Sequence, residues 1–512
     1  RQGHGRDVPV HVTHGEPVRL VLHLDPEAGG GSRTPEQVEH NEEPREVDGR
    51  LVGRAMFRLP DDLPLGWHEL EAEGPSARAR ATVVVVPQRL ELPEFLRPDG
   101  SCWGFMAQLY SVRSRASWGV GDFADLAELG WLAGREGADF LLVNPLHAAE
   151  PTVPMTPSPY LPTTRRFVNP LYVRVEEITE TAYLSPAERS LVEWAAEPAR
   201  ALNEDSGPID RDAAWTAKKE ALETVFAAGR SAGRQAQLDA FRAEQGQGLE
   251  DFALWCALHE RFDGGEWPPE ARLGSPGIDA LRAELAERVD FFCWLQWVAD
   301  EQLRAAHRAA LDGGMRIGIM HDLAVGVHPA GADTWALGDA LAEHIEVGAP
   351  PDMYNQQGQD WSQPPWRPDA LARAAYEPYR DMLRTVLRHA GAIRVDHVMG
   401  LFRLWWIPEG NGAQDGAYVR YDHEAMVGIL CLEAHRAGAL VIGEDLGTVE
   451  PWVRDYLVDR GVLGTSVLWF ERDGGGFRPP EEYRRLALAT VTTHDLPPTA
   501  GYLAGEHVEL RE

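Results

Sequence analysis

The chain has 512 residues, of which 44% are hydrophobic and 25% charged, so it is longer than one domain normally needs and can build a large core. Its 49 basic and 80 acidic residues give a net charge of −31. This negative charge argues against nucleic acid and anionic membranes as partners, but it leaves a neutral polymer such as a glycan possible.

The chain carries no sign of secretion or of a membrane segment. No signal peptide opens it, and its longest β-branched run, residues 83–86, is far too short to span a bilayer. The four cysteines lie far apart, without the spacing of a metal site. We therefore expect buried thiols in a reducing cytoplasm, with no membrane partner and no bound metal.

The first part of the chain has the period-two pattern of β-strands. Apolar residues alternate from Val18 to Leu24, and further strand-like segments span 51–59 and 81–86. Turn signals rich in glycine and proline separate these segments. The pattern predicts a small β-sandwich over residues 1–88, followed by a linker over 89–100.

From residue 101 to residue 512, short apolar strands alternate with helical patterns. The strand segments span residues 102–112, 139–147, 315–323, 392–398, 439–445, 463–470 and 488–495. Repeated strand–helix units predict an α/β fold whose parallel sheet closes into a (β/α)8 TIM barrel, the catalytic domain. An open doubly wound sheet is the alternative, although no glycine-rich phosphate turn follows the first strand.

Two features of the barrel region are unusual. The gap between the second and third strand segments is much longer than one crossover helix requires, and residues 185–313 look helical and charged. We therefore expect an inserted helical subdomain there. Only 17 residues follow Asp495, so the eighth strand of the barrel is expected to be missing from this chain.

Three of the predicted strands end in carboxylates. Asp396 ends the fourth strand, Glu444 the fifth and Asp495 the seventh. In barrels of this kind, functional residues gather at the carboxyl ends of the strands. Cleavage of a glycosidic bond requires one ionised and one protonated carboxyl group around that bond. The three acids are therefore a candidate catalytic site.

The neighbours of these acids suggest different roles for them. Arg394 lies two residues before Asp396, so both side chains point to the same side of the strand. Its guanidinium is expected to lower the pKa of Asp396 and keep that carboxylate anionic, as a nucleophile requires. Glu444 has no basic neighbour in its own strand and is the better candidate for the acid, whereas Asp495 would stabilise the transition state.

Each motif also has an ordinary structural interpretation. Arg394 and Asp396 would form a structural ion pair, Glu444 would be an exposed acid in a turn, and Asp495 would cap a helix. These alternatives stay open for each motif alone. Three acids at the ends of three strands of one barrel nevertheless favour catalysis.

Several segments resemble the motifs of glycoside hydrolase family 77, the amylomaltases or 4-α-glucanotransferases, which are relatives of the α-amylases. Around the acids these motifs are Arg-Val-Asp-His at 394–397, Gly-Glu-Asp-Leu-Gly at 443–447 and Thr-His-Asp at 493–495. Two further matches are the loop at 158–172, after the second strand, and a lid loop at 348–361, after the third. The resemblance extends from about residue 101 to the end of the chain, and the N-terminal β region resembles an extra domain of longer bacterial members.

The resemblance implies roles for the residues around the acids. Asp396 would be the nucleophile, Glu444 the acid/base and Asp495 the stabiliser of the transition state. His397 and His494 would bind sugar hydroxyls, and Arg394 would orient Asp396.

The resemblance also implies aromatic contacts to the substrate. Tyr160 would stack on a donor-side glucose, Asp322 would contact the site, and Tyr354 and Trp361 of the lid loop would lie over the acceptor side. Packing roles for Tyr160 and Trp361, and a helix cap for Asp322, are the alternatives.

The implied reaction needs no cofactor. The enzyme would cut α-1,4-glucans such as maltodextrin, amylose and glycogen branches, and would transfer the piece to the 4-hydroxyl of glucose, maltose or a maltodextrin by a retaining double displacement. A retaining α-amylase-type hydrolase is one alternative, because the same three acids serve it, and a non-catalytic glycan-binding barrel is another. An aromatic loop from 348 to 368 that holds the acceptor and limits water would favour transfer.

Overall fold

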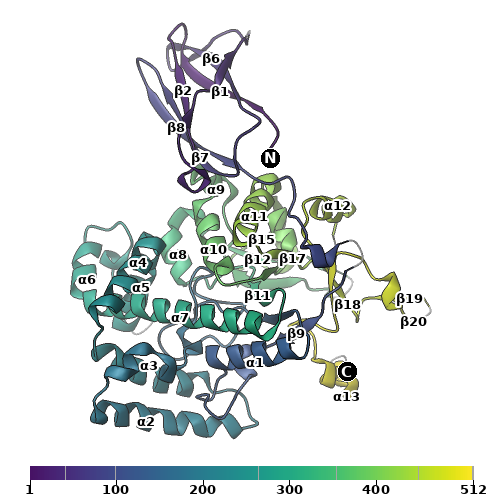
Figure 1. The fold of residues 1–512 in the computed structure, drawn as a ribbon. Helices are drawn as coiled ribbons and strands as arrows, with labels where there is room; N and C mark the ends of the chain where they lie inside the picture. Colours follow the sequence, from purple (N-terminus) through teal and green to yellow (C-terminus); the bar gives the residue numbers. More distant parts are fainter. Residues whose placement is uncertain are drawn as a thin grey trace.

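The computed structural model describes residues 1–40, 42–97, 100–262, 265–352, 355–447, 449–474 and 476–509. Figure 1 shows a β-sandwich at one end, a barrel region beneath it and a group of helices beside the barrel. None of the helices in these ranges combines the length and the apolar character that crossing a bilayer requires.

The N-terminal part is a β-sandwich, as the sequence predicts. One sheet contains β1 (Arg6–Thr13), β4 (Glu36–Val38), β5 (Arg45–Val47) and β6 (Arg50–Leu59), and the other contains β2 (Arg19–His23), β3 (Ser32–Arg33), β7 (Gly66–Glu73) and β8 (Arg78–Val85). Leu20 and Leu22, on the predicted inner face of β2, are fully buried and share a core with Phe57, Leu59 and Leu70. Alternating apolar residues therefore set the inner faces of the two sheets.

Polar and aromatic contacts attach the sandwich to two helices of the barrel, α10 (Glu377–Leu387) and α11 (His423–Ala437). Trp67 donates a hydrogen bond from its indole nitrogen to Glu433 over 2.6 Å, and the guanidinium of Arg380 lies 5.0 Å from the ring centroid of Trp67. Arg436 forms an ion pair with Asp25 at 2.6 Å. The sandwich thus lies on the outer, helical layer of the barrel (Figure 1).

Seven parallel strands of the described residues follow the chain order around the barrel. Six lie within predicted strand segments, and β21 starts one residue before its predicted segment. They are β9 (Gly104–Ala107), β10 (Phe140–Val143), β11 (Gly318–Leu323), β14 (Ala392–Val395), β17 (Leu440–Gly443), β18 (Gly464–Val467) and β21 (Ala487–Thr490). The first five form one sheet, β18 pairs with β21, and a bridge from Ile442 to Leu463 links the two sets. The strand order never reverses, as a doubly wound sheet would require, so the predicted TIM barrel is confirmed.

The long segment between β10 and β11 is helical, as predicted. It contains α2 (Pro186–Ala201), α3 (Arg211–Ala227), α4 (Ala232–Gln245), α5 (Gln247–Arg261), α6 (Ile278–Glu284) and α7 (Ala286–Gly313). The last of these also serves as the crossover helix, because it packs along α1 (Phe123–Arg135) and leads directly into β11. Glycines make this close packing possible: a Cβ at Gly134 would lie 2.8 Å from the carbonyl carbon of Gly313. The exact limits of the subdomain stay a prediction.

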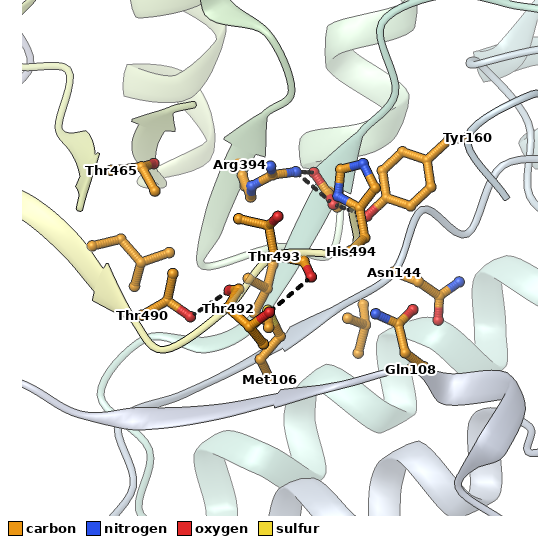
Figure 2. A pocket seen from close by; sticks show the side chains of 14 residues that line it. Met106, Gln108, Asn144, Tyr160, Arg394, Thr465, Thr490, Thr492, Thr493 and His494 are labelled. Carbon is orange, nitrogen blue, oxygen red and sulfur yellow. Dashed lines mark hydrogen bonds and ion pairs between the residues drawn. The ribbon is translucent and has the colours of Figure 1, made fainter. Parts of the chain in front are cut away.

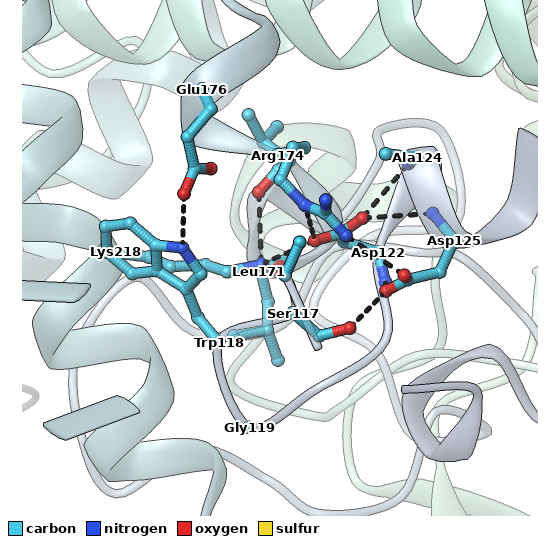
Figure 3. A network of polar contacts seen from close by, with 12 residues as sticks. Ser117, Trp118, Gly119, Asp122, Ala124, Asp125, Leu171, Arg174, Glu176 and Lys218 are labelled. Carbon is cyan, nitrogen blue, oxygen red and sulfur yellow. Dashed lines mark hydrogen bonds and ion pairs between the residues drawn. The ribbon is translucent and has the colours of Figure 1, made fainter. Parts of the chain in front are cut away.

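A buried polar network holds the inserted helices to the barrel (Figure 3). Asp122 caps α1, and Arg174, in the segment after β10, donates to Asp122 over 2.5 Å and to Asp125 over 3.0 Å. Lys218 of α3 is fully buried and donates to the carbonyls of Leu171 and Val173 over 2.7 and 3.0 Å. Three segments distant in sequence are therefore joined by charges that must stay paired away from water.

The predicted lid loop is largely a β-hairpin, which the sequence does not predict. Its strands β12 (Ile345–Ala349) and β13 (Gln359–Gln363) pair with each other, and β12 also pairs with β15 (Arg403–Pro408), which pairs with β16 (Ala417–Arg420). This antiparallel sheet is built from loops that follow β11 and β14. The other elements are α8 (Ala332–Leu337), α9 (Pro368–Arg373), α12 (Pro451–Asp459), β19 (Arg472–Asp473), β20 (Gly476–Phe477), α13 (Thr499–Ala504) and α14 (Glu506–Glu509).

Candidate active site

The carboxyl ends of three adjacent strands bring acidic side chains together. Asp322 is the penultimate residue of β11, Asp396 follows β14 directly, and Glu444 follows β17 directly. The backbone ladder continues through these positions, because the amide of Asp396 donates to the carbonyl of Leu323 over 3.1 Å and that of Glu444 donates to Val395 over 2.9 Å. Asp322 therefore lies in a strand, and the helix-cap alternative for it is wrong.

Arg394 is the cation around which the acids gather. Its Nη1 donates to both carboxylate oxygens of Asp322, over 2.7 and 2.9 Å, and its Nη2 lies 2.9 Å from Oδ1 of Asp396. The hydroxyl of Tyr160 donates to Oδ2 of Asp322 over 2.7 Å. Figure 2 shows Arg394, Tyr160 and His494 on the same side of the site. One guanidinium thus pairs with two carboxylates, of which that of Asp322 is buried and that of Asp396 is largely buried.

The predicted direction of the Asp396 pKa is wrong. The pKa of Asp396 is raised to about 8, because burial and the negative charges of Asp322, Glu444 and Asp495 outweigh the lowering by Arg394. The attraction of Arg394 is insufficient because this guanidinium is shared with Asp322, and because burial disfavours the charged form of a carboxyl group. The same repulsions indicate that Glu444, after β17, and Asp495, after β21, lie close enough to Asp396 to act on its charge.

Glu444 is held by backbone amides. One carboxylate oxygen accepts a hydrogen bond from the amide of His397 over 3.0 Å, and the other accepts from the amide of Leu446 over 2.7 Å. His397 adopts a left-handed backbone conformation, with φ of 45°, in the turn that presents its amide. Glu444 is thus oriented by two segments, which contradicts the alternative of an exposed acid in a turn.

His494 and Asp495 complete the site from the segment after β21. The imidazole of His494 stacks on the Tyr160 ring with centroids 3.7 Å apart, and its Nε2 lies 3.3 Å from Asp495 and 4.0 Å from Asp396. Burial lowers the pKa of His494. The Asp495 side chain is 79% exposed, and Pro498 is the N-cap of the next helix, so Asp495 does not cap α13.

The lid hairpin brings an aromatic ring to the same site. Trp361 of β13 is half-buried, and its ring meets that of His397 edge to face with centroids 5.2 Å apart. Burial lowers the pKa of His397, so this imidazole stays neutral. Tyr354, predicted to lie over the acceptor side, falls outside the described residues.

A small cavity lies among these side chains at the inner end of the site. Its volume is about 20 Å³, and its lining includes Asn144, Tyr160, Asp322, Arg394 and His494 (Figure 2). This is room for about one water molecule. The cavity itself is therefore too small for a ligand of several heavy atoms.

A second ion pair, which the sequence does not predict, lies behind the acids. Asp445 is 1% exposed and accepts hydrogen bonds from the amide of Thr465 over 3.0 Å and from Arg484 over 2.5 and 2.8 Å. It ties the end of β17 to β18 and to the segment before β21. The acid next to Glu444 is visible in the sequence, but its partner lies 39 residues away, and no spacing rule connects the two.

The described residues contain no group of three or more histidine, cysteine, aspartate or glutamate side chains placed to hold a metal ion. The site instead offers carboxyl groups that share one cation and repel one another, beside neutral imidazoles. Such a set can supply a nucleophile and can accept and return a proton.

Comparison with protein families gives two matches. The family model described as 4-alpha-glucanotransferase matches residues 107–512, which include the last residue of β9 and all of the other six barrel strands. The model described as the MalQ N-terminal beta sandwich domain matches residues 1–87.

Individual proteins give the same result. A 4-alpha-glucanotransferase of Mycobacterium tuberculosis is 53% identical, with 100% of this chain and 72% of that protein covered. The crystal structure of amylomaltase from Corynebacterium glutamicum matches with a TM-score of 0.92 and 51% identity, over 100% of this chain and 71% of that one. An amylomaltase from Streptococcus agalactiae in complex with acarbose shares the fold, with a TM-score of 0.67 and 19% identity over 80% of this chain and 82% of that one.

Proposed function

Because the chain belongs to the 4-alpha-glucanotransferase family, glycoside hydrolase family 77, we propose that its α-1,4-glucan transfer is carried out by Asp396, Glu444 and Asp495. The observation that supports these roles is the geometry of the site. Arg394 lies 2.9 Å from Asp396, the Nε2 of His494 lies 4.0 Å from Asp396 and 3.3 Å from Asp495, and the amide of His397, next to Asp396, donates to Glu444 over 3.0 Å. The family match favours transfer over the hydrolase alternative.

In the first half of the reaction, an oxygen of Asp396 attacks C1 of the donor glucose. The bond between C1 and the glycosidic oxygen breaks, and Glu444 gives its proton to that oxygen as the leaving chain departs. Asp495 faces the mouth of the site, where its charge favours the oxocarbenium-like transition state. The product of this half is a glycosyl ester on Asp396.

In the second half, the 4-hydroxyl of an acceptor sugar gives its proton to Glu444, and its oxygen attacks C1. The ester bond to Asp396 breaks, so the carboxylate and the protonated Glu444 are both restored. The raised pKa of Asp396 favours a protonated carboxyl group at this position in the free site at neutral pH. The reactive form has that proton on Glu444 and the negative charge on Asp396.

The remaining residues would bind and orient the sugar. Arg394 would hold Asp396 in place through their 2.9 Å contact, and Tyr160 would present its ring to a donor glucose while Asp322 fixes its hydroxyl. His397 and His494, both neutral, would hydrogen-bond to hydroxyls. Trp361 would face the acceptor.

The proposed donors are maltodextrin, amylose and glycogen branches, and the proposed acceptors are glucose, maltose and short maltodextrins. The acarbose complex of the Streptococcus agalactiae amylomaltase is consistent with an oligosaccharide ligand in this fold. Four free cysteines support the proposal that the enzyme works in the cytoplasm, where thiols stay reduced.

Incubation with maltotriose tests the proposal. Transfer predicts glucose together with a ladder of longer oligomers on chromatography, whereas hydrolysis gives only glucose and maltose. The Glu444→Gln variant should lower kcat on the order of 10²–10⁴-fold, as expected for loss of a general acid. Glu409→Gln, at an exposed acid directly after β15, is the matched control. Unchanged activity of Glu444→Gln would contradict the assigned mechanism.

A further inference from the structure

The lid hairpin contains a bulge next to the active site. Val347 of β12 pairs with Gln363, but the next residue, Gly348, pairs with Asp360, so Trp361 and Ser362 lie outside the regular ladder. Ser362 has a left-handed backbone, with φ of 55°, and its amide donates to the side chain of Asp360 over 2.8 Å. Bulges of this kind redirect a side chain. Here the bulge turns Trp361 toward His397, one residue from Asp396.

Gln363 fixes the inner end of this bulge. Its side chain is buried, at 6% exposure, and its amide nitrogen donates to the backbone carbonyl of Tyr160 over 2.9 Å. Gly326, in the loop after β11, leaves room for it: a Cβ there would lie 2.6 Å from the amide oxygen of Gln363. The loops after β10 and β11 thus form the pocket that holds the Gln363 side chain.

The bond from Gln363 connects the two aromatic rings of the site. Tyr160 is held at its hydroxyl by Asp322 and at its carbonyl by Gln363, and Trp361 lies two residues before Gln363 on the same hairpin. The donor-side ring and the acceptor-side ring therefore share one hydrogen-bonded anchor. A buried amide that forms such a bond has few alternative positions, because breaking it leaves the amide and the carbonyl unpaired.

We propose that Gln363 is a positioning residue that keeps Trp361 beside Asp396 and thereby lets a sugar, rather than water, resolve the glycosyl-enzyme. This inference rests on the proposed double displacement and deepens it. Without the anchor, the bulge of β13 loses its fixed end, and Trp361 spends less time against His397. A bound acceptor sugar then loses the aromatic ring that positions it, whereas an attacking water molecule does not depend on that ring.

The test compares Gln363→Met with Gln357→Met in the full chain. Methionine keeps the length of the glutamine side chain but cannot donate a hydrogen bond. Gln357 lies at the exposed tip of the same hairpin, and its substitution is the matched control. Each protein is incubated with maltotriose, and the longer oligomers from transfer are measured against the new reducing ends from hydrolysis. We expect the ratio of transfer to hydrolysis to fall about tenfold in Gln363→Met, the usual effect of one lost hydrogen bond.

A second variant perturbs the Gln363 side chain from the loop after β11. Gly326→Ala should displace the amide of Gln363 and lower the same ratio, even if Gln363→Met folds poorly. A merely structural role would reduce transfer and hydrolysis in equal proportion, so an unchanged ratio in folded variants would overturn the inference. If the wild-type protein itself forms no longer oligomers, the proposed function fails instead, and the two failures are distinguishable.

Discussion

Acid should destabilise this protein through a buried histidine of the barrel, and one substitution should remove that sensitivity. His321 of β11 is 6% exposed, and burial together with His307 and His389 lowers its pKa to about 3, from an ordinary value of about 6.5. The folded protein therefore keeps this imidazole neutral at pH 5, whereas the unfolded chain protonates it. Its contribution to stability is present above pH 6.5 and is lost as the pH falls from 6.5 toward 3.

The size of this effect follows from the two pKa values. Each pH unit between them changes the free energy of unfolding by about 1.4 kcal/mol, so His321 removes about 2 kcal/mol of stability between pH 7 and pH 5. Asparagine at this position is polar but does not titrate. The loss of stability caused by His321→Asn should therefore be about 2 kcal/mol smaller at pH 5 than at pH 7.

Urea unfolding, followed by tryptophan fluorescence at both pH values, measures this difference directly. His344→Asn is the matched control, because Glu409 raises the pKa of that exposed histidine and reverses the sign of its contribution. Equal losses of stability at pH 5 and pH 7 in His321→Asn would show that this imidazole is protonated in the folded protein, and would refute the reasoning.

Three further substitutions have defined outcomes. Lys218→Met leaves the carbonyls of Leu171 and Val173 without their donor and removes one of the two cations near Asp122, Arg174 being the other. It should lower the free energy of unfolding by about 3–5 kcal/mol, measured by chemical denaturation, and a smaller change than Lys219→Met would contradict the role of the network. Tyr160→Phe keeps the stacking on His494 but loses the 2.7 Å bond to Asp322, so kcat/KM on maltotriose should fall about tenfold or more. Asp322→Asn removes a charge that raises the pKa of Asp396, so the acidic limb of the pH–activity profile should move to lower pH by about one unit, and a shift to higher pH would contradict this assignment.

The barrel strands are predictable because of how parallel sheets are built. Strands such as β10 and β14 are buried on both faces, so they form short apolar runs, and the first polar residue after each run lies at the functional edge. The same rule identifies Asp396 and Glu444. The sequence does not predict the lid hairpin, because β13, from Gln359 to Gln363, is polar and bulged. It lacks the alternation of apolar and polar residues on which strand prediction depends.

Charge states are the part of the site that the sequence does not determine. The spacing of Arg394 and Asp396 correctly predicts that they lie side by side. The pKa of Asp396, however, depends on burial and on the charge of Asp322, which lies on another strand, β11. The pairing of Asp445 with Arg484 cannot be predicted from the sequence either, because the two residues lie on different segments. Such interactions depend on the closed barrel and not on local sequence.

The sharing of one guanidinium by two carboxyl groups has a consequence for ligand design. Around Arg394 the site holds more negative than positive charge, although its substrate is neutral. A sugar analogue with a protonated nitrogen in place of the glycosidic oxygen would gain an attraction that no natural glucan receives. Its affinity should increase with pH while Asp396 ionises, until the amine itself loses its proton, so alkaline buffer is the condition under which to screen such inhibitors.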